Sequence, residues 1–232
     1  MIRTLIAVGI VFGALMLWPG AGALYDLLAA PLTKHLPQGA TLIATSVITP
    51  FLVPLKITLM AAFLIALPYV LYQVWAFVAP GLYSHEKKMV LPLVVSSTIL
   101  FLVGVAFVYF VVIPGLAGFI QAVAPQSITA APDVEEYFGF VLTLFLVFGI
   151  AFEVPIAVIV LVRIGVVTVE QLKKVRGYFI VGAFVVAAIV TPPDVISQLA
   201  LAIPMCLLYE AGIIAARLFV KHTKAPEDAP TP

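Results

Sequence analysis

Three long uncharged runs constrain the fold of this chain more than any other feature. No Asp, Glu, Lys or Arg occurs between Thr4 and Tyr25, between Ile57 and Ser84, or between Met89 and Pro132. Each run exceeds the roughly 20 apolar residues that a helix needs to cross a bilayer. Because a helix satisfies its own backbone hydrogen bonds in lipid, the runs predict an all-α integral membrane protein.

The composition supports this class and excludes several others. Charged residues make up 10% of the 232 residues, against about a quarter in soluble domains. A net charge of +1 gives no electrostatic signal for nucleic acid. The single cysteine, Cys206, has no internal disulfide partner, and His35, His85 and His222 show no metal-ligand spacing. We therefore expect no metal site and no cofactor.

Charges, prolines and turn residues divide the chain into six apolar segments. They cover about residues 4–24, 55–79, 90–113, 138–162, 178–190 and 195–218. Residues 25–54 are expected to form a loop, the stretch after 113 a loop with a short interfacial helix, and TVEQLKK a short helix capped by Thr168. The result is a six-span membrane domain over residues 1–218, followed by a disordered cytoplasmic tail over 219–232.

The fifth segment is expected to be short. From Gly177 to Pro193 the chain has length for about 25 Å of helix, less than the roughly 30 Å thickness of hydrocarbon. The positive charges predict the orientation, since ten of the twelve Lys and Arg residues fall on the side of the termini and Lys34 and Lys56 on the other. Both termini are thus predicted to be cytoplasmic.

One acid, Glu153, lies near the middle of the fourth apolar segment. Its i−4 and i+4 neighbours are the small residues Gly149 and Ala157, and Pro155 leaves the carbonyl of Ala151 without its helical donor. An ionised, unpaired carboxylate costs several kcal/mol in such a setting. Two interpretations stay open: a working group in a cavity or interface, or a protonated glutamate that holds helices together.

Three further acids are candidates. Glu210 lies in the last apolar segment close to its cytoplasmic end, where a structural ion pair and a functional role are equally compatible with the sequence. Asp194 opens that segment after two prolines, and helix capping explains it. Glu86 lies on a turn beside His85, where an isolated charge is most often solvated.

Enzymatic functions find little support. The sequence has no HExxH or GxSxG motif, no pair of intramembrane aspartates and no phosphate-binding loop. We therefore do not expect an enzyme, and any work that the protein does is expected to draw on a partner or an ion gradient.

Several stretches together resemble the TatC family, the polytopic subunit of the twin-arginine protein translocase. They are APLTKHLPQGATLIAT, VLYQVWAFVAPGLYSHEKK, FGIAFEVPIA, VGAFVVAAIVTPPDVISQ and AIPMCLLYE. They follow the family's order and spacing from about residue 6 to residue 218. The resemblance implies six helices with cytoplasmic termini, forming a concave wall in which the fifth and sixth helices are short.

The resemblance also implies a function. Members of the family are receptors for twin-arginine signal peptides and core subunits of a translocase that exports folded proteins with the proton motive force. The implied partners are single-span TatA- and TatB-type proteins and further copies of the chain, in the bacterial cytoplasmic (inner) membrane.

The resemblance assigns roles to individual residues. Glu86 matches the glutamate of the first cytoplasmic loop that reads the arginine pair, a role suited to a carboxylate because it accepts two hydrogen bonds from a guanidinium. Its neighbour His85 and Phe77, at the end of the second span, are expected to contribute to this signal-peptide site. Glu153 matches the intramembrane glutamate that faces the cavity, and with Glu210 it forms the expected site of contact with a partner helix.

Three residues on the opposite side of the membrane complete the predicted sites. Pro31 and Phe51 match the first periplasmic loop and Asp194 the last periplasmic turn, where they are expected to contact signal peptide or partners or to support the structure. One departure concerns the beginning of the chain. Family members usually start with an amphipathic segment of the type His-Leu-x-Glu-Leu-Arg, which supplies a second glutamate, whereas this sequence starts with MIRTLIAVGI. A start assigned too late, a truncated chain and weakened recognition all fit this departure.

Two other functions would use the same residues differently. A proton-coupled small-solute transporter would use Glu153 and Glu210 as proton carriers, but no internal repeat supports it. A structural scaffold for other membrane subunits would bind no signal peptide.

Overall fold

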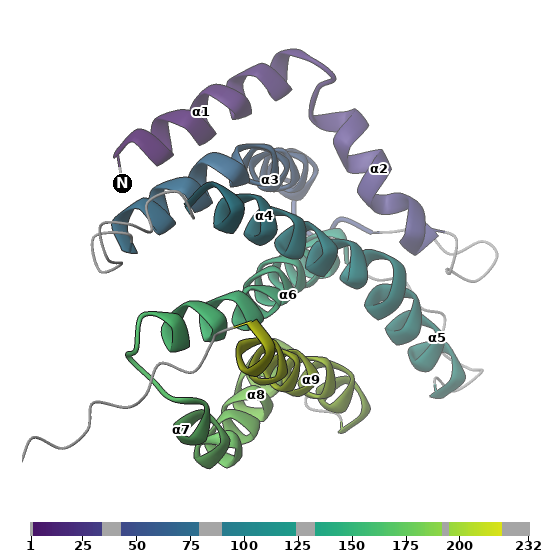
Figure 1. The fold of residues 1–232 in the computed structure, drawn as a ribbon. Coiled ribbons are helices and arrows are strands. Elements are labelled where there is room, and N and C mark those ends of the chain that lie inside the picture. Colours follow the sequence, from purple (N-terminus) through teal and green to yellow (C-terminus); the bar gives the residue numbers. More distant parts are fainter. Residues whose placement is uncertain (1, 34–42, 79–89, 124–132, 192–194, 220–232) are drawn as a thin grey trace, which may run out of the picture.

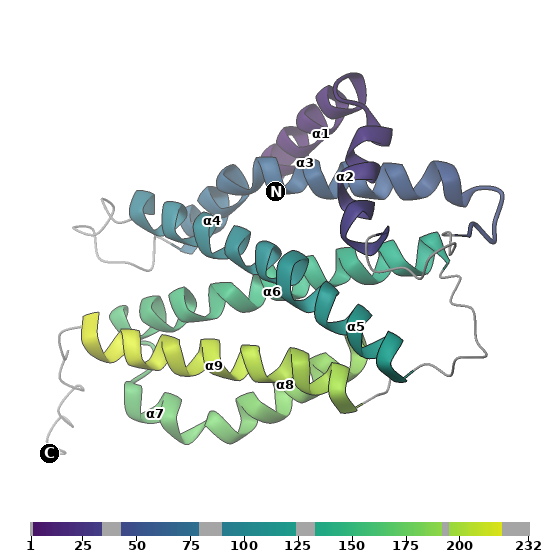
Figure 2. The same cartoon turned by 90° about the vertical axis from the view of Figure 1, so that its right-hand side faces the viewer.

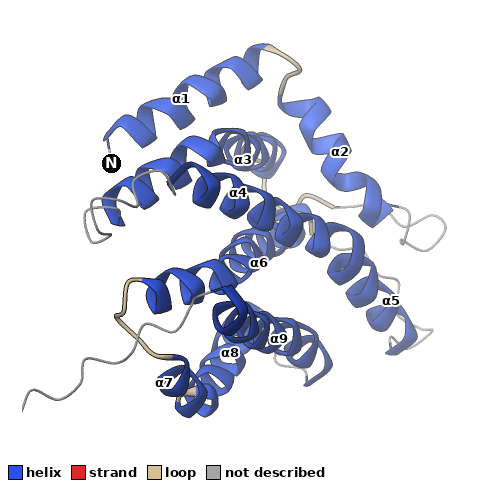
Figure 3. Cartoon of the chain, viewed as in Figure 1, coloured by secondary structure: helices blue, strands red, loops and turns tan. Residues whose placement is uncertain are grey.

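The computed structural model describes residues 2–33, 43–78, 90–123, 133–191 and 195–219, and within these ranges the chain is helical with short turns (Figures 1 and 3). The helices, in chain order, are α1 (Ile2–Leu17), α2 (Ala21–Thr33), α3 (Thr49–Val78), α4 (Val90–Phe107), a π-helical turn (Val108–Val112), α5 (Ile113–Val123), α6 (Val134–Arg163), α7 (Val169–Lys174), α8 (Arg176–Val190) and α9 (Val195–Phe219).

All six predicted apolar segments form helix, which confirms the all-α membrane class. Four stretches are long and apolar enough to cross a bilayer: Thr49–Phe77, Leu91–Gly118, Val134–Arg163 and Val195–Leu218. The first predicted segment is broken, because α1 and α2 meet at an angle of 90°. Together they form at most one further span, so the count of six crossings stays a prediction.

The lengths of the last two helices differ from each other. α8 has 15 residues, or about 22 Å of helix, so the short fifth segment is confirmed. The expectation of a short sixth helix is wrong, because α9 has 25 residues and is long enough for the hydrocarbon core. Pro204 lies inside α9 without ending it.

The third apolar segment does not end at Ile113. The chain passes through a π-helical turn, in which the N–H of Ile113 donates to the carbonyl of Val108, and continues as α5 to Val123. Pro114 has no N–H to donate to the preceding turn, and a π-helical turn is one way for a helix to shift its hydrogen bonds at such a site. The predicted end of the third segment at residue 113 is therefore wrong, because the helix continues through Pro114 and Gly115.

The loop predicted over residues 25–54 is also partly helical. α2 extends through Thr33, and α3 begins at Thr49, five residues before Pro54. Pro50 fits because the first turn of a helix has no partner for its N–H groups. Pro54 lies inside α3, and the hydroxyl of Thr58 donates to its carbonyl at 2.8 Å.

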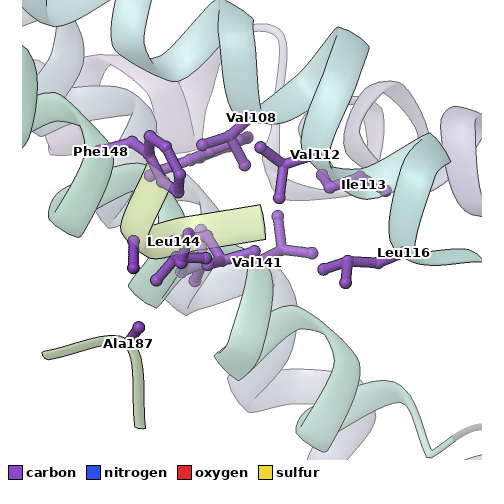
Figure 4. Close-up of a cluster of buried hydrophobic side chains, with 12 residues drawn as sticks. Val108, Val112, Ile113, Leu116, Val141, Leu144, Phe148 and Ala187 are labelled. Carbon is purple, nitrogen blue, oxygen red and sulfur yellow. The ribbon is translucent and has the colours of Figure 1, made fainter. Parts of the chain in front are cut away.

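α6 is the centre of the fold, with α4 packed on one side and α9 on the other (Figures 1 and 2). The main core joins α6 to the end of α4, the π-helical turn, α5, α8 and α9, and Val141, Leu144 and Phe148 of α6 lie within it (Figure 4). α1 packs against α3 but has no buried residue. The core around α6 is therefore built mainly by the helices from α4 onward, and α1 adds no buried side chain to it.

Two helix beginnings are fixed by capping side chains. Thr168 forms a capping box with Gln171 at the beginning of α7, as the sequence predicts. Asp133 caps α6 by accepting hydrogen bonds from the backbone N–H groups of Glu135 and Glu136.

Candidate functional site

The carboxyl group of Glu153 lies inside the helix assembly. Both of its oxygens are buried, and neither has a hydrogen-bond partner of normal geometry among the described residues. Ser97, on the neighbouring helix α4, lies opposite Glu153 in the antiparallel register of the two helices. The acid is thus held between α4 and α6, as expected for a helix interface.

The two helices approach closely beside this acid. A methyl group in place of the hydrogen of Gly149 would collide with the ring of Phe101 on α4. Because α4 and α6 run antiparallel, Ser97, one turn before Phe101, comes opposite Glu153, one turn after Gly149. The small residue predicted beside Glu153 therefore gives room to an aromatic ring of α4.

Ser97 is fixed by a second helix. Its side chain is fully buried, and its oxygen accepts a hydrogen bond of 2.9 Å from the indole Nε1 of Trp75 on α3. Trp75 also packs against a buried cluster formed by Leu67, Leu71 and Phe101. Three helices, α3, α4 and α6, thus meet at the position of Glu153.

Glu210 has a different environment. Its Oε2 accepts a hydrogen bond of 2.6 Å from the guanidinium of Arg176 at the beginning of α8. The adjacent Tyr209 donates to the carbonyl of Leu172 and stacks on Phe179, with ring centroids 4.1 Å apart. Glu210 therefore joins α9 to α8, and the structure does not bring it together with Glu153.

A group of polar side chains joins the region before and within α3 to the beginning of α6; we call it the α3–α6 polar cluster. Lys56 Nζ lies 2.8 Å from Oε1 of Glu135, and the hydroxyl of Thr49 donates to Oε2 of Glu135 at 3.0 Å. Asp133 accepts from the backbone N–H and the hydroxyl of Thr45 at 3.1 and 2.7 Å. These hydrogen bonds, the side-chain bond from Thr45 first, lower the pKa of Asp133 below its ordinary value.

The other predicted site residues are distributed over the fold. Phe77, near the end of α3, is 87% exposed, and Phe51, in the first turn of α3, is 67% exposed. Pro31 lies in the last turn of α2. Glu86, His85, Asp194 and the predicted tail from residue 220 lie outside the described residues.

The sequence reasoning missed several of these residues. Ser97 and Trp75 carried no local signal that they would meet Glu153, because the contact depends on the pairing of three helices. Asp133 could have been found, since an Asp followed by two glutamates and an apolar run is typical of a helix beginning. Lys56 and Glu135 are 79 residues apart, and only the fold pairs them.

Comparisons with known proteins agree on one family. The family model described as "Sec-independent protein translocase protein (TatC)" matches residues 1–204. The chain is 50% identical to the TatC protein of Halothiobacillus neapolitanus over 95% of its length, 50% identical to that of Haemophilus influenzae over 94%, and 47% identical to that of Escherichia coli K12 over 98%. It spans 60%, 85% and 88% of these three relatives, respectively.

A solved structure shows the same fold. The crystal structure of a TatC described as a twin-arginine translocase receptor is 42% identical in sequence and superposes with a TM-score of 0.83, covering 94% of each chain. A second crystal structure of that receptor, in the detergent DDM, gives a TM-score of 0.81. With a family model over most of its length, relatives near 50% identity and a shared fold, this chain belongs to the TatC family of multi-pass bacterial membrane proteins.

Proposed function

We propose that this protein is a signal-peptide receptor and core membrane subunit of a twin-arginine translocase, which exports folded proteins with the proton motive force. The observation that carries the proposal is the close superposition on a twin-arginine translocase receptor at 42% sequence identity. The relatives named above are translocase proteins, so their role supports transport and gives no support for catalysis.

Recognition of the arginine pair is assigned to the segment between α3 and α4, residues 79–89. Glu86 is the arginine-reading carboxylate, because a carboxylate can accept two parallel hydrogen bonds from a guanidinium and distinguishes it from the point charge of lysine. His85 and Phe77 contribute beside it, and the exposure of Phe77 at the end of α3 supports a contact role. We assign both termini and this segment to the cytoplasmic side, because ten of the twelve Lys and Arg residues fall on that side of the predicted topology.

Contact with a partner helix inside the bilayer is assigned to Glu153. Its buried oxygens have no hydrogen-bond partner among the described side chains. A hydrogen bond from a polar group of an incoming helix would offset the free-energy cost of burying them unpaired. The partners are single-span TatA- and TatB-type proteins, and the receptor complex contains further copies of this chain. Pro31, Phe51 and Asp194 are contact or support positions on the periplasmic side.

The alternative of a proton-coupled solute transporter is not favoured. It needs Glu153 and Glu210 as carriers on one path, but Glu210 is paired with Arg176 and the two acids have different neighbours. We instead assign Glu210 the role of fixing α8 against α9. In that role it would affect partner binding through the position of these two helices, and not through the direct contact that the sequence predicted.

Export of a twin-arginine cargo tests the proposal. Cells that lack their own TatC would be supplied with this chain, with Glu86→Ala or Glu153→Ala, or with the control Glu136→Gln, whose side chain is exposed on α6. Glu86→Ala and Glu153→Ala should each reduce export at unchanged protein level, and the control should not. Export at the parent rate by Glu86→Ala would contradict the assigned recognition.

A further inference from the structure

Ser97 differs from its two hydroxyl-bearing neighbours on α4. The hydroxyl of Ser96 donates to the carbonyls of Pro92 and Leu93, and that of Thr98 donates to the carbonyl of Val94 at 2.7 Å. Such bonds to the preceding turn are the usual way to satisfy a hydroxyl inside an apolar helix. Ser97 accepts from Trp75 instead, and its own hydroxyl proton is thereby left for another acceptor.

The direction of the hydrogen bonds is fixed by chemistry. The indole N–H of Trp75 can only donate, so the oxygen of Ser97 is the acceptor in this bond. A hydroxyl carries one proton of its own, which it can donate while it accepts. The carboxyl of Glu153 lies opposite this hydroxyl in the α4–α6 register that the contact between Phe101 and Gly149 sets, and its oxygens have no hydrogen-bond partner among the described residues.

Packing holds the three side chains in this arrangement. Phe101, one turn after Ser97, lies against Gly149, one turn before Glu153. Phe101 also belongs to the cluster against which Trp75 packs. A shift of α3 relative to α4 would therefore disturb both the hydrogen bond from Trp75 to Ser97 and the packing of Trp75 beside Phe101.

We propose that Ser97, itself oriented by Trp75, positions the carboxyl of Glu153 at the α3–α4–α6 junction for a polar group of an incoming helix. Ser97 and Trp75 are positioning residues, because they act through Glu153. This inference rests on the proposed role of Glu153 as a partner contact. It deepens that role by assigning two residues that orient the acid.

A ligand-free measurement tests the arrangement itself. The chain has two tryptophans, and Trp18 is 83% exposed, so a Trp18→Phe background leaves Trp75 as the sole indole reporter. Fluorescence emission would be recorded for this background, Ser97→Ala, Glu153→Gln and the double variant. Glu153→Gln should shift the emission of Trp75 when Ser97 is present and leave it unchanged in the Ser97→Ala background.

A matched control exists on the next residue. Ser96→Ala removes a hydroxyl from the same helix but no contact with Trp75 or Glu153, and it should leave the Glu153→Gln shift intact. An equal shift caused by Glu153→Gln with and without Ser97 would overturn the proposed arrangement.

A second measurement tests positioning for function. A photo-crosslinking residue at Ile150, an exposed position one turn before Glu153, would capture a TatB-type single-span partner in vesicles. If the hydroxyl of Ser97 donates one hydrogen bond to the acid, as proposed, Ser97→Ala should lower capture about three- to tenfold at unchanged protein level and unfolding midpoint. Trp75→Phe, which keeps the ring and removes the N–H, should give part of this loss.

Non-additivity separates positioning from a structural role. If Ser97 acts through Glu153, adding Ser97→Ala to Glu153→Ala causes no further loss of capture. Losses that multiply, or capture that falls only with protein level, would overturn the inference. If the parent captures no partner at all, the proposed function fails, while the fluorescence cycle still decides the arrangement of Trp75, Ser97 and Glu153.

Discussion

Arg176 donates a hydrogen bond of 2.6 Å to Glu210, joining the beginning of α8 to α9. Their side chains are 44% and 39% exposed, so the pair is only partly buried. The pair gives the acid of the last span a partner within the chain. It also ties α8, which at 15 residues is shorter than the roughly 30 Å of hydrocarbon, to the longer α9.

Breaking this pair should cost stability. Glu210→Gln leaves the guanidinium of Arg176 without its carboxylate, and we expect a loss on the order of 1 kcal/mol, typical of a partly exposed pair. A lower unfolding midpoint of the solubilised protein would show the loss. Glu170→Gln, in the exposed first turn of α7, is the control, and an equal decrease for both would contradict the assigned anchor.

The close approach of α4 and α6 predicts an effect of one methyl group. Gly149→Ala would force the ring of Phe101 away and should destabilise the protein by about 1–3 kcal/mol. Gly139→Ala, also on α6, meets nothing within 4 Å and should be neutral or slightly stabilising, because Ala favours helix. Urea or thermal unfolding of the two variants compares them directly, and equal effects would count against the tight interface.

Exchange of charges tests the α3–α6 polar cluster. Lys56→Glu and Glu135→Lys should each lower the unfolding midpoint, because each places two like charges at a contact of 2.8 Å. The double exchange should recover part of the loss by restoring an opposite pair. A double variant as unstable as the sum of the single variants would show that the ion pair is unimportant.

The Asp133–Thr45 contact should depend on pH in one direction. Because hydrogen bonds lower the pKa of Asp133 in the folded protein, its carboxylate stabilises the fold above the ordinary value of 3.8, and this contribution is lost as the pH falls through the folded value. The difference in unfolding midpoint between the parent and Asp133→Asn should be constant near neutral pH and shrink below about pH 4. A difference that grew on acidification would contradict this sign.

The sequence predicted those parts of the fold that depend on local pattern. Apolar runs located the helices, Thr168 and Gln171 located the cap of α7, and the short interval before Pro193 predicted the short α8. It failed at Pro114, because a π-helical turn lets the helix continue where a proline and a glycine indicate an end.

The candidate site was only partly predictable for a physical reason. Glu153 is visible in the sequence because a charge in an apolar run is costly. Ser97 is one of three successive hydroxyl residues, and which of them faces another helix is decided by the packing of α4. Trp75 and Ser97 are 22 residues apart in the sequence, and Glu153 is farther still from Ser97. No local sequence pattern can therefore predict that these side chains meet.

Binding of signal peptides to the solubilised protein is the direct test of whether this chain reads the arginine pair. A twin-arginine peptide and its twin-lysine counterpart would be compared on the parent and on Glu86→Ala. We expect the parent to bind the arginine peptide at least about tenfold more tightly, because the lysine peptide lacks the bidentate contact with the carboxylate, and Glu86→Ala to remove this preference. Equal affinity of the parent for the two peptides would contradict it.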